Sequence, residues 1–228
     1  MLGIVFLFLT VVPLHAVLAI FGFRQLIPPL FLRWVGVCAG LRVRTIGRPH
    51  PGALFLANHV SWLDILALAG SARAIFVAHS GLAGHAGLRW LCRQNDTIFI
   101  TRDRRGTVDA QVAQVQAALG DRPVTIFPEA TTDDGRSLLP FRSSLLAAVE
   151  PLSATVPVQP VALEYADAAE IAWVGEEPGL ANFRRVLSRP GRLLLTIHYL
   201  PPLESAELRD RKTMALAARN AIAAALHL

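Results

Sequence analysis

The stretch that decides the fold is ALFLANHVSWLD, residues 53–64. Its first five residues form an apolar run of strand length. The polar residues Asn58 and His59 then end that run, and an apolar helical pattern starts shortly before Asp64. An apolar strand that leads through a short turn into a helix is the repeating unit of α/β proteins. Polar side chains at such a strand exit lie where α/β sheets bind their ligands.

The same alternation continues through the rest of the chain. Several runs consist almost entirely of Val, Ile, Leu and Phe, as expected for strands that are buried on both faces. Between them, one apolar face runs along residues 107–119, and residues 204–227 are rich in Ala and helical in character. We therefore predict an α/β domain with a layered mixed sheet of about seven strands, flanked by helices. The predicted strands are residues 43–46, 53–57, 74–78, 97–101, 124–127, 158–163 and 193–199.

The N-terminal region is strongly apolar. No charged residue occurs before Arg24, and a second apolar segment, residues 26–41, is interrupted by Pro28 and Pro29. The first run could form a helix of about 33 Å, which is long enough to cross a bilayer core. A cleaved signal peptide is disfavoured because no basic residue precedes the run; a buried core helix is the other alternative. We predict membrane-anchoring helices in residues 1–41 and an α/β domain in residues 42–228.

The basic residues support this division. The formal net charge of +5 lies entirely before Asp64, which is the first acidic residue, and the remainder of the chain is balanced. A basic segment beside apolar helices is attracted to an anionic cytoplasmic leaflet. We therefore expect the inner membrane as the location, with the α/β domain on the cytoplasmic side, and no nucleic acid as a partner. The two cysteines, Cys38 and Cys92, show no spacing typical of a metal site or a disulfide.

His59 and Asp64 are the strongest candidates for catalysis. On a continuous helix, residues five apart point about 140° away from each other. The two side chains can therefore meet only if His59 lies in the turn and the helix begins near Ser61. An alternative is that Asp64 merely caps the helix in a capping box with Ser61. Both roles are compatible if one carboxylate oxygen caps and the other orients the imidazole.

Three other segments carry polar groups at strand ends. Residues 127–132 place Glu129, two threonines and a small residue after a predicted strand, where they could hold a polar head group or form an ordinary turn with Asp133-Asp134-Gly135. Arg102 ends the strand 97–101 and could bind a phosphate, or belong to a solvated charge cluster. Residues 156–163 contain two prolines and suit either an edge strand or the lining of an acyl pocket.

Taken in sequence order, these segments resemble the motifs of the glycerolipid acyltransferase family, of the 1-acylglycerol-3-phosphate acyltransferase type. Asn58-His59 with Asp64 is similar to the family's His-x4-Asp motif, and residues 127–131 are similar to its Phe-Pro-Glu-Gly-Thr motif. Residues 97–102 and 156–163 resemble its second and fourth motifs. The resemblance implies catalytic roles for His59 and Asp64. It implies that substrate is bound by Arg102, Glu129, Ala130, Thr131, Thr132 and Arg142.

Two departures from the family pattern concern the acceptor. The family usually has Gly where Ala130 stands and Arg where Thr132 stands, and that Arg is linked to the phosphate of the acceptor. The Thr-Thr version is similar to branches that act on lyso-ornithine lipid or on lysophospholipids with larger head groups. Arg102, Arg136 or Arg142 could compensate for the missing arginine.

The resemblance implies a membrane-associated enzyme of polar lipid biosynthesis. It would transfer a fatty acyl group from acyl-carrier protein or coenzyme A to the free hydroxyl of a lysolipid, with no metal and no cofactor. The expected acceptor is 1-acylglycerol-3-phosphate or a related lysophospholipid, and the alternative is lyso-ornithine lipid. A non-catalytic lipid-binding protein of the same fold and a hydrolase are the competing classes.

Overall fold

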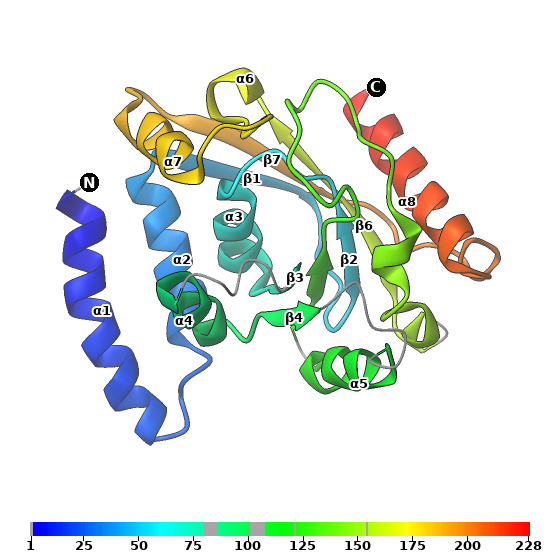
Figure 1. The fold of residues 1–228 in the computed structure, drawn as a ribbon, viewed down its shortest axis with the longest axis horizontal. Helices are drawn as coiled ribbons and strands as arrows, with labels where there is room; N and C mark the ends of the chain where they lie inside the picture. The colour runs from blue at the N-terminus through cyan, green and yellow to red at the C-terminus, as the bar shows by residue number, and fades with distance from the viewer. Residues whose placement is uncertain (1, 80–85, 101–107, 121, 154) are drawn as a thin grey trace.

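A computed structural model describes residues 2–79, 86–100, 108–120, 122–153 and 155–228. Its centre is a seven-stranded sheet with the strand order β1-β7-β6-β2-β5-β3-β4 (Figure 1). The strands are β1 (Leu41–Gly47), β2 (Leu54–Ala57), β3 (Ile75–His79), β4 (Ile98–Ile100), β5 (Val124–Ile126), β6 (Val158–Tyr165) and β7 (Leu193–Tyr199). The predicted mixed sheet of about seven strands is confirmed, with ends that differ by at most two residues.

Neighbouring strands are parallel except for β6 and β7, which are antiparallel. Strands β2 to β6 therefore run in one direction, and β1 and β7 run in the other. The middle strand β2 lies between β5 and β6, and all four of its residues are buried. As a result, the segments that follow β2, β5 and β6 leave the sheet side by side, at the carboxyl ends of these strands.

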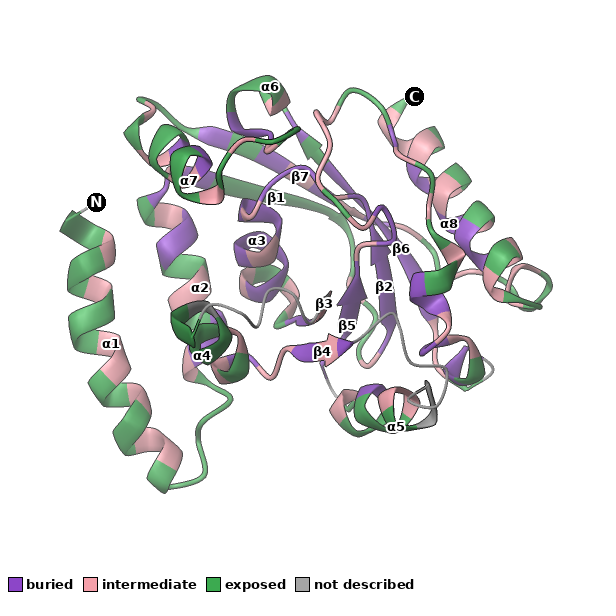
Figure 2. Ribbon diagram, in the orientation of Figure 1, coloured by how far each residue is buried: buried purple, intermediate pink, exposed green. Residues whose placement is uncertain are grey.

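Helices cover both faces of the sheet. They are α1 (Leu2–Ile20), α2 (Ile27–Cys38), α3 (Leu63–Ala72), α4 (Ala86–Gln94), α5 (Val108–Ala118), α6 (Ala168–Ile171), α7 (Gly179–Ser188) and α8 (Arg211–Leu226), with short 3-10 helices η3 (Ser143–Leu146), η4 (Glu150–Leu152) and η5 (Ser205–Glu207). One apolar core joins α2, α3 and α7 to the sheet, and the other joins α5, α8 and η3 to the opposite face. The buried strands between these helical layers are visible in Figure 2.

The two N-terminal helices differ in how they pack. α1 has 19 residues and a mean hydropathy of 2.5, and none of it is buried, so it is long and apolar enough to cross a membrane. It lies beside α2 at the periphery (Figure 1), where Phe8 contacts Phe31 edge to face. In contrast, α2 buries Val35 and Gly36 against the core. Pro28 and Pro29 do not interrupt this second apolar segment but begin its helix, because the first turn does not need their missing N–H groups.

The fourth segment is an interior strand, so the edge-strand alternative is wrong. β6 pairs with β2 on one side and β7 on the other. Pro160 cannot donate a backbone hydrogen bond to Leu200 across this ladder. The side-chain amide of Gln159 takes over that role and donates to the Leu200 carbonyl at 2.7 Å, which explains how an interior strand tolerates a proline here.

Candidate active site

His59 and Asp64 are in contact at the carboxyl end of β2. Nδ1 of His59 lies 2.8 Å from Oδ2 of Asp64. They can meet because β2 ends at Ala57 and α3 begins at Leu63, close to the predicted start, so that His59 lies in the connecting turn. The Asp64 side chain is fully buried, whereas 18% of the His59 side chain is exposed. Within the described residues, Nε2 of this ring has no hydrogen-bond partner, which is the arrangement of an oriented general base.

The carboxylate of Asp64 organises the turn as well as the imidazole. Its Oδ2 also accepts the backbone N–H groups of Val60, at 2.8 Å, and Ser61, at 3.0 Å. Its Oδ1 accepts the phenol of Tyr165 at 2.6 Å. The expectation that one oxygen caps and the other orients the ring is therefore wrong. Oδ2 orients the ring and holds the turn before the helix. The N-cap of α3 is Trp62, without a side-chain cap hydrogen bond, so the predicted capping box with Ser61 is also wrong.

Contacts across the sheet hold the turn in place. The Asn58 amide donates to the Leu163 carbonyl at 3.0 Å and accepts the Leu163 N–H at 2.8 Å, which ties the exit of β2 to β6. On the other side, the His59 ring stacks on Phe127, just after β5, with centroids 4.0 Å apart and planes inclined by 16°. The imidazole is thus positioned by both neighbours of β2.

Glu129 is a buried carboxyl beside this pair. Its Oε1 accepts the backbone N–H of His59 at 3.2 Å. In the described part of the chain, its buried Oε2 has no partner. Burial raises the pKa of Glu129 from 4.5 to about 8; backbone hydrogen bonds from His59 and Leu139 lower it, and the charges of Asp133 and Asp64 add to the increase. With a pKa near 8, most of this carboxyl is protonated at pH 7, and a proton on Oε2 could be donated to a ligand.

The turn after Glu129 contains the three small residues of the predicted substrate site. Ala130 adopts a φ of 68°, a left-handed conformation that costs a residue with a Cβ about 1–2 kcal/mol. Glycine, which the resemblance leads us to expect here, avoids that cost. Thr131 is exposed. The Thr132 hydroxyl donates to the carbonyl of Trp173, so it fastens the turn to the segment after α6 and keeps only its oxygen free as an acceptor.

Of the two predicted arginines, Arg142 and Arg102, the structure describes only Arg142. Arg142 is tethered to the turn because its backbone N–H donates to the Pro128 carbonyl at 2.8 Å, and its exposed guanidinium has no partner among the described residues. Arg102 lies outside the described residues. In the predicted reversal, Gly135 adopts a φ of 75°, and the Arg136 N–H donates to the Asp134 carboxylate at 2.8 Å.

Tyr165 is a site residue that the sequence analysis missed. It is the last residue of β6, two positions beyond the predicted end of this strand. A signal was present, because Val161, Leu163 and Tyr165 alternate with the period of a strand and belong to the core on the α3 face. Extending the predicted strand to residue 165 would have placed the phenol at the carboxyl end of this strand, which is the end of the sheet where His59 lies.

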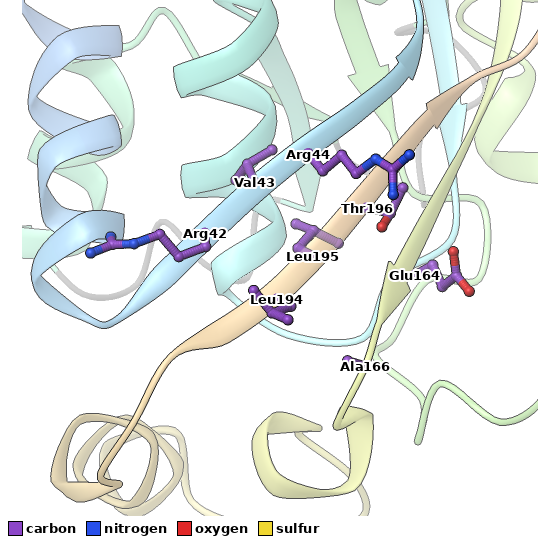
Figure 3. Close-up of a pocket in the computed structure, with 8 residues that line it drawn as sticks. All are labelled: Arg42, Val43, Arg44, Glu164, Ala166, Leu194, Leu195 and Thr196. Atoms are coloured by element: carbon purple, nitrogen blue, oxygen red, sulfur yellow. The ribbon is translucent and has the colours of Figure 1, made fainter.

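Two surface hollows lie away from this pair. One of about 310 Å³ is at the exposed side of β1, β7 and β6, where Arg44 extends toward Thr196 (Figure 3). The other, of about 400 Å³, lies between α2, β1 and α3. His59 lines neither of them, and the site is identified by its hydrogen bonds instead of by volume. The described residues contain no cluster of three His, Cys, Asp or Glu side chains suited to a metal, and the absence of a metal from the reaction stays a prediction.

The known proteins that this chain resembles in sequence include several lipid acyltransferases. A lyso-ornithine lipid O-acyltransferase of Rhodobacter capsulatus is 34% identical over 225 residues, which cover 92% of this chain and 78% of the relative. A lyso-ornithine lipid O-acyltransferase of Pseudomonas aeruginosa is 35% identical over 85% of this chain and 77% of the relative. A 1-acyl-sn-glycerol-3-phosphate acyltransferase of Neisseria meningitidis is 31% identical over 77% of this chain and 72% of the relative.

The fold and the family agree with these relatives. The crystal structure of the 1-acyl-sn-glycerophosphate acyltransferase PlsC from Thermotoga maritima matches with a TM-score of 0.61 and 18% identity, over 90% of this chain and 77% of that chain. This likeness supports the fold. A sequence model of the family described as Acyltransferase matches residues 42–164, a range that includes His59, Asp64 and Glu129. The chain belongs to the Acyltransferase family.

Proposed function

We propose that the protein transfers a fatty acyl group from an acyl thioester to the free hydroxyl of a lysolipid, with His59 as the general base. The contact between Nδ1 of His59 and Oδ2 of Asp64, at 2.8 Å, carries this proposal. It leaves Nε2 as the ring nitrogen that can take a proton. Membership of the Acyltransferase family supports transfer to an alcohol over hydrolysis and over a non-catalytic lipid-binding role.

The chemical step needs an activated nucleophile more than an activated leaving group. A thiol has a pKa of about 8.5 and leaves readily, whereas an alcohol attacks poorly until its proton is removed. Nε2 of His59 takes that proton as the hydroxyl oxygen bonds to the thioester carbonyl carbon. Asp64 stabilises the resulting imidazolium. The C–S bond then breaks, and the proton passes from the imidazolium to the leaving thiolate, so that the base is restored and no cofactor is required.

Glu129 supplies a neutral polar group next to the base. Because its pKa is raised to about 8, the carboxyl can donate from Oε2 to an oxygen of a bound substrate at pH 7. We place the acceptor's head group or its reacting hydroxyl at this atom. An unpartnered buried oxygen supports that role, since buried polar atoms usually have partners and a substrate would supply the missing one.

We infer that lyso-ornithine lipid is the preferred acceptor. The resemblance associates an arginine at the position of Thr132 with the phosphate of the acceptor, and the Thr132 hydroxyl is bound to the Trp173 carbonyl instead. Asp133 and Asp134 follow directly, so this turn carries acidic side chains that suit the amino group of ornithine better than a phosphate. Among the sequence relatives, the two lyso-ornithine lipid O-acyltransferases match over 92% and 85% of this chain, and the Neisseria meningitidis 1-acyl-sn-glycerol-3-phosphate acyltransferase matches over 77%.

A lysophosphatidic acid is the second candidate acceptor. The exposed guanidinium of Arg142 supports it, because its backbone is tethered to the turn that carries Glu129 and its side chain is not engaged elsewhere among the described residues. A guanidinium at this place could bind a phosphate bidentately. The Neisseria relatives are described as enzymes of that type.

We propose that α1 anchors the catalytic domain of residues 42–228 to the cytoplasmic face of the inner membrane. Its apolar surface is exposed, and exposed Arg24 and Arg33 follow it. Such a basic flank favours the cytoplasmic leaflet. Both the acceptor and the product are membrane lipids, so an anchored site can receive the lysolipid from the bilayer.

The test is a transfer assay with the purified full-length protein in detergent. Labelled acyl-carrier protein and labelled acyl-coenzyme A serve as alternative donors, and lyso-ornithine lipid and 1-acylglycerol-3-phosphate serve as acceptors. We expect a diacylated product, with a kcat/KM at least about tenfold higher for lyso-ornithine lipid. Release of free fatty acid without transfer would identify a hydrolase, and no turnover of either donor would identify a lipid-binding protein.

Two substitutions at one position test the acceptor assignment. Thr132→Arg introduces the cation that the resemblance links to phosphate and should raise kcat/KM for 1-acylglycerol-3-phosphate relative to lyso-ornithine lipid. Thr132→Val removes the same hydroxyl without adding charge, so it controls for loss of the bond to Trp173. If both variants change the acceptor ratio equally, charge at this position does not select the acceptor.

A further inference from the structure

We propose that Tyr165 is a positioning residue for catalysis, and that it acts by holding the Asp64 carboxylate in the orientation that serves His59. The evidence is the division of the hydrogen bonds between the two oxygens of Asp64. Oδ2 accepts from the His59 ring and from two backbone N–H groups. Oδ1 accepts from the phenol of Tyr165 at 2.6 Å and, among the described residues, from nothing else.

This bond helps to hold the carboxylate in one orientation. Asp64 is fully buried, so water does not solvate an oxygen that loses its protein donor. The three donors on Oδ2 hold one end of the carboxylate. A donor on Oδ1 fixes the second end of the group, so that Oδ2 stays directed at Nδ1 of His59. The same bond satisfies an anionic oxygen that would otherwise be costly to bury.

The phenol is itself well placed to do this. Tyr165 is 8% exposed and belongs to the core on the α3 face, so its ring is held by packing. Its strand is tied to the catalytic turn two residues earlier, where Leu163 makes both hydrogen bonds with Asn58. Burial, together with the nearby charge of Asp64, raises the pKa of Tyr165 well above its usual value, so the hydroxyl remains a donor.

Tyr165→Phe removes the hydroxyl and retains the ring and its packing. Tyr199→Phe is a matched control, because Tyr199 is also a buried tyrosine on the α3 face. Its hydroxyl lies 2.8 Å from Oγ of Ser71, which is in α3 like Asp64. We expect Tyr165→Phe to lower kcat by about 10- to 100-fold, the effect of one lost hydrogen bond to a charged group. KM for both substrates should stay within about twofold, because the phenol does not touch them. Tyr199→Phe should lose somewhat less thermal stability, because its hydrogen bond is to a neutral hydroxyl, and it should keep its kcat.

A double-mutant cycle shows whether the effect passes through Asp64. In an Asp64→Asn background, adding Tyr165→Phe should change kcat by less than about twofold, because the carboxylate that the phenol positions is already gone. A further tenfold loss in that background would contradict the proposal. An unchanged kcat for the single Tyr165→Phe variant would also overturn it, as would equal losses of activity and stability in the two tyrosine variants.

This inference rests on the proposed acyl transfer, and the same assay separates the two. A wild-type protein that transfers no acyl group to any acceptor removes the proposed function and the inference with it. An active wild type with an unaffected Tyr165→Phe variant removes the inference alone.

Discussion

Replacing Glu129 with Gln should make the stability of the protein less sensitive to alkaline pH. The Glu129 carboxyl is buried, and its pKa is raised from 4.5 to about 8 in the folded protein. Between these two values, the folded state keeps a proton that the unfolded state releases. The stability that this neutral carboxyl contributes is fully present below pH 4.5 and is lost as the pH rises toward 8. Gln is neutral at every pH and nearly the same size, so the variant lacks this dependence.

The magnitude follows from the difference between the two pKa values. Each pH unit in that interval costs the wild type about 1.4 kcal/mol of unfolding free energy from this group. Between pH 5 and pH 8, the wild type should therefore lose about 2 to 4 kcal/mol relative to Glu129→Gln. At pH 5 the two proteins should differ little, because the Gln carbonyl can still accept the His59 N–H that Oε1 accepts now.

The assay is urea unfolding of the full-length proteins in detergent, followed by tryptophan fluorescence at several pH values. Comparing variant and wild type at each pH cancels the titration of all other groups. Glu176→Gln, at an exposed position, is the control for a change of charge without burial. If the stability difference between wild type and Glu129→Gln is the same at pH 5 and pH 8, Glu129 titrates normally and its proposed role as a neutral donor is wrong.

Three further predictions concern catalysis, backbone strain and anchoring. Asp64→Asn should lower kcat by about 10²- to 10⁴-fold with a much smaller effect on the melting temperature; parallel losses would indicate that Asp64 only stabilises the turn before α3. Ala130→Gly should stabilise the protein by up to about 1 kcal/mol in thermal unfolding, because it relieves the left-handed φ of 68°, whereas Ala217→Gly inside α8 should destabilise it by about 1 kcal/mol. Deleting residues 1–22 removes α1 and leaves α2 in the core. The protein should then move from the membrane pellet to the supernatant on ultracentrifugation, with an unchanged circular dichroism spectrum. A protein that stays in the pellet is not anchored by α1.

The sequence was sufficient to predict the features that depend on local patterns. Continuous apolar runs predicted the buried strands, because strands covered on both faces need apolar side chains at every position. Residues 193–199 form β7 with the bounds that were predicted. The contact between His59 and Asp64 was also predictable, since the two residues are only five positions apart and a turn before the helix is the one arrangement that joins them.

Side-chain chemistry within a strand was harder to predict. The two prolines of residues 156–163 suggested an edge strand, because proline lacks the donor that an interior ladder needs. The Gln159 amide supplies a donor from the neighbouring position, and this compensation depends on where Leu200 lies in the folded protein. Proline alone therefore indicated the wrong place in the sheet.

Only the tertiary structure decided what surrounds the catalytic pair. Glu129 reaches the His59 backbone across 70 positions of sequence, and Tyr165 reaches Asp64 across 101. These contacts arise because β5 and β6 lie on either side of β2, an order that follows from packing two apolar cores against the sheet and not from any local pattern. The sequence alone determined that a histidine and an aspartate would meet. The strand order decided which neutral carboxyl and which phenol would lie beside them.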